Sequence, residues 1–448
     1  IYTLLMDKKI NVFLFFLFVL GFPLAYFFIP KSVKSDNEKR KLATFPSFNS
    51  KDYLAGTWTK QVDKYIDDHF PFRTSFISST DYFHAAKGFQ LKNSERVVVL
   101  PKKRTKTQGE STDSTKNQMA FLDEFEEKYA GSMLIIDGCV YPMGGGSPAM
   151  SKYFAEMVNE YARTFKGVRV FSAVAPLSSA FIPVEKYAHY NSQNKRTLLA
   201  IKNNLKDGAI FCDVFNELNE HSNTKLYFGT DHHWKPLGAY YGYVAFCKAA
   251  GLEAVPMEKM TKKVKYNFLG TMYQHTQDPT VRAHPDTMEY WVPKVQTEAV
   301  KFGPYNTDKP SKTKVFYESS SGGNTYSTFL GGDEPLIRIK TGIKNGKKAV
   351  IIKNSMGNAF AVYLVNHYQE IWVVDLRYSK QNLTKIIHEN DINDIVFAVG
   401  MYAAMSKGTI GMMRRLTTQS GVYVPPPVQT EPNPLNENPV VIDSMNAE

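Results

Sequence analysis

The stretch 348–360, KAVIIKNSMGNAF, joins a short apolar run to a segment with helical character. The apolar part predicts a strand that is covered on both faces, as strands of parallel sheets are. Similar apolar runs recur at 133–136, 168–174, 209–214, 371–374 and 395–399, with predicted helices between them. Short strands that alternate with helices favour an α/β fold with a doubly wound, mostly parallel sheet and helices on both faces.

Ser355 lies where the predicted strand of this stretch ends and the predicted helix begins. Its Oγ would face the carboxyl edge of the sheet, where ligands bind in open α/β folds. Backbone N–H groups of the first helical turn could then stabilise an oxyanion. A serine at this position can also be a simple helix N-cap. The segment alone leaves both roles open.

A second polar group, TDHHWKPLGA at 230–239, precedes another predicted helix. Asp231 stands two residues before His233, and a hydrolase-type dyad needs such a pair. The histidine takes a proton from a nucleophile, and the carboxylate fixes its tautomer and stabilises the imidazolium. By spacing alone, His232 could also be the base. Metal binding is the weaker alternative, because no HxxxH or HExxH spacing supports the two histidines.

The segment 12–29 is uncharged and mostly apolar, and its length is close to the lower limit for crossing a bilayer. No small-residue cleavage pattern follows it. We expect a membrane anchor over 1–31 and a polar stalk over 32–50, with the rest of the chain outside the cytoplasm, in the periplasm or at the cell surface. The formal net charge of +11 suits an anionic partner such as an acidic glycan. No nucleic-acid motif is present, so nucleic acid is not an expected partner.

The α/β pattern occupies 51–417 and is interrupted at about 253–312 by a segment with aromatics, prolines and little period. We expect this segment to be an insertion. After 417 the composition shifts to proline, asparagine and acidic residues, which predicts a disordered tail over 418–448. The GGGSP loop at 144–148 has neither a Walker lysine nor a Rossmann fingerprint, so we expect a turn, with a backbone contribution to a cleft as the weaker alternative. The three cysteines show no metal-site spacing.

The segment 230–239 resembles the signature of the DHHW-motif proteins. These are similar to the SGNH hydrolase-like domains of the periplasmic alginate O-acetyltransferase family. The apolar N-terminal segment, the stalk sequence SDNEKRKLATFP, DHFPFR at 68–73, the segment around Ser355 and WVVDLRY at 372–378 match the pattern in the same order. In that pattern an aspartate precedes the serine and a bulky aromatic follows it, whereas Asn354 and Met356 stand here. The usual SGNH order also places the serine first in the chain.

The resemblance implies a Ser-His-Asp triad in which Ser355 is the nucleophile, His233 the general base and Asp231 its orienting acid. Arg377 is a candidate for holding substrate or supporting the site, and a salt bridge with Asp375 is its alternative role. The remaining supporting or substrate-binding candidates are His232, Trp234, Asn354 and Met356.

We therefore expect an extracytoplasmic O-acyltransferase, in the simplest case an O-acetyltransferase, that modifies an exported or cell-surface polysaccharide. The resemblance implies a membrane-bound O-acyltransferase as a candidate acetyl donor. If water accepts the acyl group instead, the same residues give a carbohydrate acetylesterase. An inactive, membrane-anchored glycan-binding or scaffold protein of the same fold is a third hypothesis. Neither a metal nor a cofactor is expected.

Overall fold

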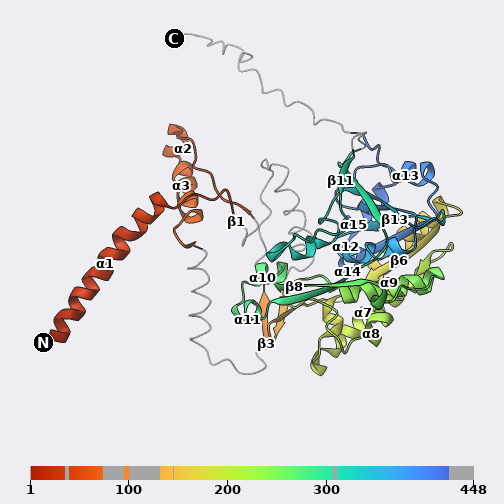
Figure 1. Cartoon of the computed structure of the whole chain (residues 1–448), viewed down its shortest axis with the longest axis horizontal. Helices are drawn as coiled ribbons and strands as arrows, with labels where there is room; N and C mark the ends of the chain where they lie inside the picture. The colour runs from red at the N-terminus through yellow and green to blue at the C-terminus, as the bar shows by residue number, and fades with distance from the viewer. Residues whose placement is uncertain are drawn as a thin grey trace, which may run out of the picture.

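The computed structural model of the chain describes residues 2–35, 40–73, 95–99, 132–144, 146–305 and 310–422. Its helices and strands are labelled along the chain in Figure 1. Most of the predicted tail lies outside the described residues. Residues 418–422 still contact the α/β body, because the Gln419 side-chain amide donates to the carbonyl oxygens of Ser379 and Gln381. The body therefore extends past the predicted boundary at 417.

The central element is an eight-stranded sheet with the order β11-β10-β12-β14-β13-β15-β6-β7. Its strands are β6 (Arg169–Ala175), β7 (Ile210–Phe211), β10 (Thr297–Phe302), β11 (Ser311–Thr313), β12 (Leu336–Thr341), β13 (Lys348–Lys353), β14 (Glu370–Asp375) and β15 (Asp394–Gly400). Neighbours from β14 to β7 pair in parallel, and β12, β10 and β11 extend the sheet with antiparallel pairs. The prediction of a doubly wound, mostly parallel α/β sheet of SGNH-hydrolase-like type is confirmed.

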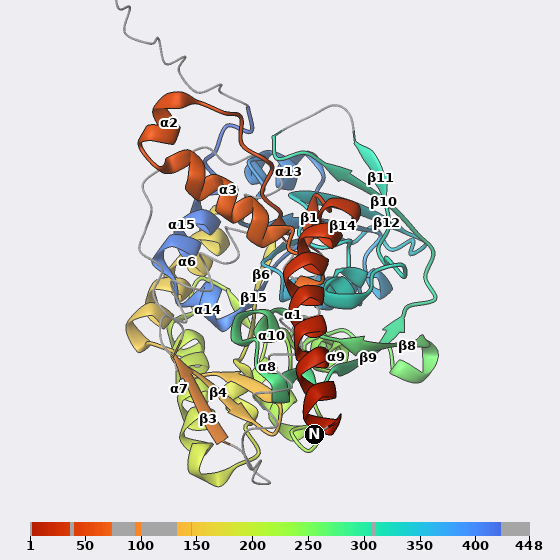
Figure 2. The same ribbon diagram turned by 90° about the vertical axis from the view of Figure 1, so that its left-hand side faces the viewer.

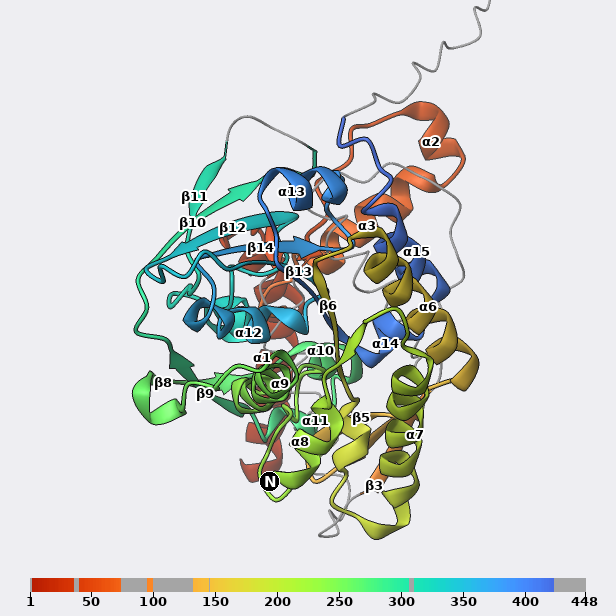
Figure 3. The same ribbon diagram turned by 90° about the vertical axis from the view of Figure 1, so that its right-hand side faces the viewer.

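Helices cover both faces of this sheet, as Figure 3 shows for α9 and α12 on one side and α6 and α15 on the other. The principal helices are α6 (Pro148–Thr164), α7 (Ala188–Asn204), α8 (Val214–Glu220), α9 (Pro236–Ala250), α12 (Gly357–Ala361), α13 (Leu383–Glu389), α14 (Met401–Ala404) and α15 (Lys407–Arg415). Alternate residues of β13 face the two layers. Ile351 lies in the core that contains residues of α9 and α12, and Ile352 lies in the core that contains residues of α6 and α15. β13 is therefore buried on both sides.

The apolar run at 133–136 forms a strand outside the main sheet. β4 (Ser132–Ile136) pairs with β3 (Glu95–Val99) and β5 (Cys139–Pro142) in a separate, antiparallel three-stranded sheet. Met133 and Ile135 pack against Met272 and Val281 in a small core of their own. We expected this run to belong to the parallel sheet. A short apolar run indicates burial and does not say which sheet it joins.

The predicted insertion at 253–312 consists of two structural parts. β8 (Thr261–Phe268) and β9 (Asp286–Val292) form an antiparallel pair, and α10 (Thr271–Thr276) and α11 (Pro279–Arg282) lie between them. β10 and β11 instead belong to the main sheet. The second part is thus an integral edge of the α/β body, and the first part supplies contacts to the site described below.

The N-terminal elements lie apart from the α/β body in Figure 1, and Figure 2 views the molecule from their side. α1 (Tyr2–Phe28) contains the segment Ile10–Phe28, 19 residues with a mean hydropathy of 2.2 and no buried part. Its length and composition fit either a membrane anchor or a signal sequence. The elements after it are β1 (Lys34–Ser35), β2 (Arg40–Lys41), α2 (Ser50–Leu54) and α3 (Thr57–Asp68). In the predicted stalk, the Phe45 ring packs edge-on against Trp58 and Tyr65 of α3.

Candidate active site

Ser355 lies in a tight turn between β13 and α12, at the carboxyl end of the central parallel strand. The turn is closed by hydrogen bonds from Gly357 N to Asn354 O (3.0 Å) and from Asn358 N to Ser355 O (3.2 Å). The residue at the N-cap of α12 is Met356, and no side chain caps this helix. The simple N-cap role that the sequence left open for Ser355 is therefore not adopted. The serine is 5 % exposed.

The turn around Ser355 presents backbone N–H groups that the fold leaves unused. Among the described residues, no acceptor pairs with the N–H of Ser355 or of Met356. Backbone N–H groups beside a nucleophile can stabilise the oxyanion of a tetrahedral intermediate. The turn thus has the donors that this chemistry needs.

Asp231 and His233 lie in a loop between α8 and α9. The segment is a closed loop outside the main sheet, and the predicted helix follows it as α9. An isolated β-bridge joins Tyr227 to Trp234, and Lys235 N donates to Leu226 O at 2.7 Å. Pro236 then occupies the first turn of α9, where its missing N–H costs no hydrogen bond.

A second carboxylate, Asp286 at the start of β9, forms hydrogen bonds with the backbone of this loop. It accepts hydrogen bonds from Gly229 N (3.1 Å), Thr230 N (2.8 Å) and Thr230 Oγ1 (2.8 Å). The residue is buried. Asp286 fixes the backbone immediately before Asp231. No local pattern in the sequence pointed to Asp286, because it lies in the segment that showed little period.

Asp231 is buried and accepts four hydrogen bonds. Oδ1 accepts from His233 Nδ1 at 2.5 Å and from His233 N at 3.0 Å. Oδ2 accepts from Thr271 N at 2.8 Å and from Thr271 Oγ1 at 3.1 Å. Gly270 allows the Thr271 loop to approach this closely, because a Cβ on Gly270 would lie 2.2 Å from the Asp231 Cβ. The carboxylate is therefore held on both oxygens.

The environment of Asp231 favours its ionised form. Burial opposes ionisation, but the positive charges that His233 and His232 can carry and the hydrogen bonds from His233 and Thr271 outweigh it and hold the pKa of Asp231 well below its usual range. The side chain therefore stays a carboxylate at neutral pH. A carboxylate at this place fixes the proton of His233 on Nδ1 and would stabilise the imidazolium.

His233 has the geometry of a general base. With Nδ1 bonded to Asp231, Nε2 is left as the acceptor nitrogen. Nε2 is buried and has no hydrogen-bond partner among the described residues. His232 is placed differently, with Nδ1 lying 2.8 Å from Thr271 Oγ1 and 3.7 Å from Asp231 Oδ1. Burial and the neighbouring His233 hold the pKa of His232 well below its usual value. The geometry thus favours His233 as the base.

Two aromatic side chains join the histidine loop to the serine turn. Trp234 Nε1 donates to Met356 O at 2.9 Å. The Tyr326 ring stacks on the His233 imidazole, with ring centroids 3.8 Å apart and planes 11° apart. The Tyr326 hydroxyl also lies 3.2 Å from Ser355 O, to which it donates. Asp231, His233 and Ser355 therefore meet in one buried cluster. No local pattern in the sequence pointed to Tyr326.

Arg377 forms salt bridges with two buried or half-buried acids. Its guanidinium bonds to Asp375 through Nε (3.0 Å) and Nη2 (2.8 Å), and Nη2 also lies 2.9 Å from Asp333 Oδ2. Lys353, the last residue of β13, pairs with Asp375 at 2.7 Å and with Asp333 at 3.3 Å. The two acids and two bases balance in charge. Burial opposes the ionisation of Asp333, but the charges of Arg377 and Lys353 outweigh burial and hold the pKa of Asp333 well below its usual range.

This ion-pair network supports the serine turn. Asn358, three residues after Ser355, donates from Nδ2 to Asp333 Oδ1 at 3.0 Å. Asn354, directly before Ser355, accepts from Gly400 N at 3.2 Å and so ties the end of β13 to the end of β15. Asn354 and Met356 are both buried. The residues on either side of the serine thus hold the turn in place.

Ligand atoms of Asp231, His232 and His233 lie within 4.8 Å of one another. In the structure, the Nδ1 atoms of the two histidines are engaged in hydrogen bonds with Asp231 and Thr271. The cluster is arranged for hydrogen bonding.

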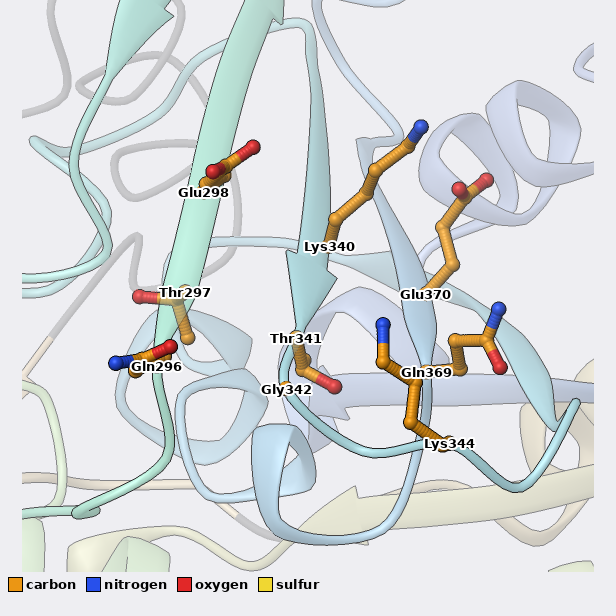
Figure 4. A pocket seen from close by; sticks show the side chains of 9 residues that line it. All are labelled: Gln296, Thr297, Glu298, Lys340, Thr341, Gly342, Lys344, Gln369 and Glu370. Carbon is orange, nitrogen blue, oxygen red and sulfur yellow. The ribbon is translucent and has the colours of Figure 1, made fainter.

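A surface pocket lies at the opposite end of the parallel strands (Figure 4). Gln369 and Glu370, which line it, are at the start of β14, and Glu370 pairs with Lys348 at the start of β13. Ser355 follows the other end of β13. The pocket also contains Lys340 and Lys344, so its lining carries both signs of charge. It is separate from the cluster of Asp231, His233 and Ser355.

Comparisons with known proteins identify the family. The family model of the DHHW proteins matches residues 123–374, which include both loops of the site. A solved structure of a DHHW family protein from Eubacterium siraeum is 31 % identical, with a TM-score of 0.57 over 62 % of this chain and 94 % of that one. Two structures of Bacillus cereus PatB1 show the same fold, each over 62 % of this chain and 96 % of that one. The structure with a sulfonyl adduct is 17 % identical with a TM-score of 0.52, and the other is 18 % identical with a TM-score of 0.50. No curated protein matches the chain. The chain belongs to the DHHW protein family.

Proposed function

We propose that the protein is an extracytoplasmic, serine-dependent O-acyltransferase, in the simplest case an O-acetyltransferase, that modifies an exported or cell-surface polysaccharide. One observation carries the proposal. Asp231 and His233 form a 2.5 Å hydrogen bond that leaves a buried Nε2, without a partner in the part of the chain that the structure describes, on a loop joined to the Ser355 turn. A histidine with one nitrogen bound to a carboxylate and the other free is what a serine nucleophile needs for activation.

In the first half-reaction, Ser355 Oγ would attack the carbonyl carbon of the acyl donor as His233 Nε2 takes its proton. The N–H groups of Ser355 and Met356 would stabilise the oxyanion. When the tetrahedral intermediate collapses, the donor oxygen leaves with the proton from His233, and the acyl group remains on the serine. Asp231 stabilises the imidazolium between these steps.

In the second half-reaction, a sugar hydroxyl would give its proton to His233 and attack the acyl-serine. Collapse of the second intermediate returns the proton to Ser355 Oγ and releases the acylated sugar.

Three features support the substrate class. The resemblance to the alginate O-acetyltransferase family implies an acyl acceptor among exported polysaccharides. The net charge of +11 suits an acidic glycan. The apolar segment Ile10–Phe28, if it serves as an anchor, would hold the domain next to a membrane-bound O-acyltransferase that supplies the acetyl group. A carbohydrate acetylesterase is the second candidate, since water can replace the sugar in the same site.

The test uses 4-nitrophenyl acetate as donor and an acidic oligosaccharide as acceptor. Wild type should release 4-nitrophenol and form an acetylated sugar detected by mass spectrometry. Ser355→Ala and His233→Ala should each lose at least about 10³-fold in kcat, as removal of a triad member does in serine hydrolases. Ser172→Ala, which alters a buried serine of β6, is the matched control and should keep wild-type kcat.

The same experiment separates the alternatives. Release of acetate without sugar product would favour the esterase. A sulfonyl fluoride, which traps activated serines, should label Ser355 in wild type and not in His233→Ala. Wild-type protein that neither turns over the ester nor reacts with the sulfonyl fluoride would overturn the enzyme proposal and leave the glycan-binding or scaffold role.

A further inference from the structure

Tyr326 lies between the histidine loop and the serine turn and contacts both. It belongs to the short 3₁₀ helix η4 (Gly322–Thr328) and is 7 % exposed. Its ring is stacked on the imidazole of His233 at 3.8 Å, and its hydroxyl lies 3.2 Å from Ser355 O and 3.4 Å from Met356 O. The catalytic steps proposed above do not use this side chain. Its place in the cluster therefore calls for an explanation.

The hydroxyl contact controls the direction of one backbone amide. The carbonyl of Ser355 and the N–H of Met356 belong to the same peptide unit, and in a trans peptide these two groups point in opposite directions. Tyr326 Oη and Asn358 N (3.2 Å) both donate to Ser355 O. Holding this carbonyl keeps the Met356 N–H turned to the opposite side, where it has no acceptor among the described residues. A flip of this peptide would remove one donor from the oxyanion site.

The ring contact controls the orientation of the histidine. The Asp231 bond fixes one edge of the His233 ring, and Tyr326 covers one face of it nearly in parallel. An edge contact and a face contact together restrict rotation of the imidazole about its Cβ–Cγ bond. The direction of Nε2 is thereby fixed relative to the serine turn that Tyr326 also holds.

Tyr326 can donate throughout the physiological pH range. Burial, and then the charge of Asp231, raise the pKa of Tyr326 well above the usual tyrosine value. The hydroxyl therefore keeps its proton, and the contact with Ser355 O persists as a hydrogen bond.

We propose that Tyr326 is a positioning residue that keeps the His233 ring and the Met356 N–H aligned for acyl transfer at Ser355. It acts through these two groups, and its own atoms neither form nor break a bond in the reaction. The inference rests on the proposed function of the same site and deepens it, because it assigns a required contact to a segment outside the DHHW sequence.

The test compares two changes at Tyr326 with a matched control. Tyr326→Phe keeps the stacked ring and loses the hydroxyl, and Tyr326→Leu loses both contacts. Tyr363→Phe is the control, since Tyr363 is also buried in the same core and its hydroxyl donates to Pro236 O at 3.2 Å. Both Phe variants lose one buried hydroxyl, so their thermal stability should fall by similar amounts. Only the change at Tyr326 should affect Ser355 chemistry.

We expect Tyr326→Phe to lower kcat for 4-nitrophenyl acetate by about 10- to 100-fold and to leave KM nearly unchanged. This loss in kcat is smaller than the loss of about 10²- to 10³-fold that follows deletion of an oxyanion donor, because the donor is only misaligned. Labelling of Ser355 by a sulfonyl fluoride should slow by a similar factor. Tyr326→Leu should lose more, because it removes the ring contact as well as the hydroxyl. Tyr363→Phe should keep wild-type values.

A Tyr326→Phe kcat within twofold of that of Tyr363→Phe would show a purely structural role and overturn the inference. This comparison decides the question even if Tyr326→Leu does not fold. If wild type has no reaction that Ser355→Ala abolishes, the proposed function itself fails, and the inference fails with it. The two failures are distinguished by the wild-type and Ser355→Ala measurements alone.

Discussion

Replacing Asp231 with asparagine tests the hydrogen-bond geometry of the dyad most directly. The four donors to Asp231 are His233 Nδ1 (2.5 Å), His233 N (3.0 Å), Thr271 N (2.8 Å) and Thr271 Oγ1 (3.1 Å). An amide has one acceptor oxygen and one donor nitrogen. If the oxygen of the introduced amide faces the fixed Thr271 N–H, its nitrogen faces the imidazole. His233 must then accept on Nδ1 and carry its proton on Nε2, where it cannot act as a base.

The expected loss in kcat for Asp231→Asn is about 10⁴-fold, the loss seen when the same exchange is made in the serine-protease triad. At about 1.36 kcal/mol for each factor of ten, this corresponds to about 5 kcal/mol of transition-state stabilisation. The assay is Ser355-dependent hydrolysis of 4-nitrophenyl acetate at neutral pH. Far-UV circular dichroism would establish that the fold is retained.

Asp286→Asn is the matched control for this prediction. Asp286 is also a buried carboxylate that accepts backbone N–H groups of the same loop, but among the described residues its hydrogen bonds go to Gly229 and Thr230 and not to an imidazole. The control should lower the melting temperature and cost far less in kcat. The argument is refuted if Asp231→Asn stays within tenfold of wild type while Ser355→Ala is inactive, or if Asp286→Asn loses as much kcat as Asp231→Asn.

Two further predictions concern stability. The folded-state pKa of Asp231 lies below its unfolded value, so its ionised form contributes stability above about pH 4 that is lost as the pH falls through the folded pKa. The difference in unfolding free energy between wild type and Asp231→Asn, measured with urea, should therefore become smaller as the pH is lowered from about 5 to about 2. A difference that stays constant over this range would contradict the depressed pKa of Asp231. Lys353→Met removes one of the two bases that neutralise the buried Asp375. The free energy of unfolding, measured with urea, should fall by about 3–5 kcal/mol, as it does when one partner of a buried ion pair is lost. A decrease below about 1 kcal/mol would contradict the role given to Lys353.

The buried parallel strands could be predicted because most of their residues are apolar, and this pattern is visible in the local sequence. The apolar runs at 349–353, 371–374 and 395–399 appear in the structure as β13, β14 and β15. Each is covered on both faces, so every residue contributes to the pattern. β10 and β12 pair across the edge of the sheet and mix buried with exposed residues. Their place depends on partners far along the chain, which no local pattern contains.

The same distinction applies to the candidate site. Asp231, His233 and Ser355 were named from short segments with a chemical rationale, and the structure brings these segments together through Trp234 and Tyr326. The groups that position them come from elsewhere: Thr271 from the start of α10, Asp286 from β9 and Tyr326 from a glycine- and serine-rich stretch. Their roles follow from tertiary packing alone. Short segments of the sequence pointed to the candidate reactive groups, and only the three-dimensional arrangement located the residues that support them.

Asn354, directly before Ser355, stands where the family pattern has an aspartate. Asn354 Oδ1 accepts the Gly400 N–H at 3.2 Å, and a carboxylate oxygen could accept the same hydrogen bond. The tie between the ends of β13 and β15 thus needs an acceptor there and no negative charge. Nearby, Asp333 and Asp375 already balance Lys353 and Arg377, so a neutral Asn354 leaves that balance intact. A neutral asparagine before Ser355 is therefore compatible both with the hydrogen bond to Gly400 and with the charge balance of the ion-pair network.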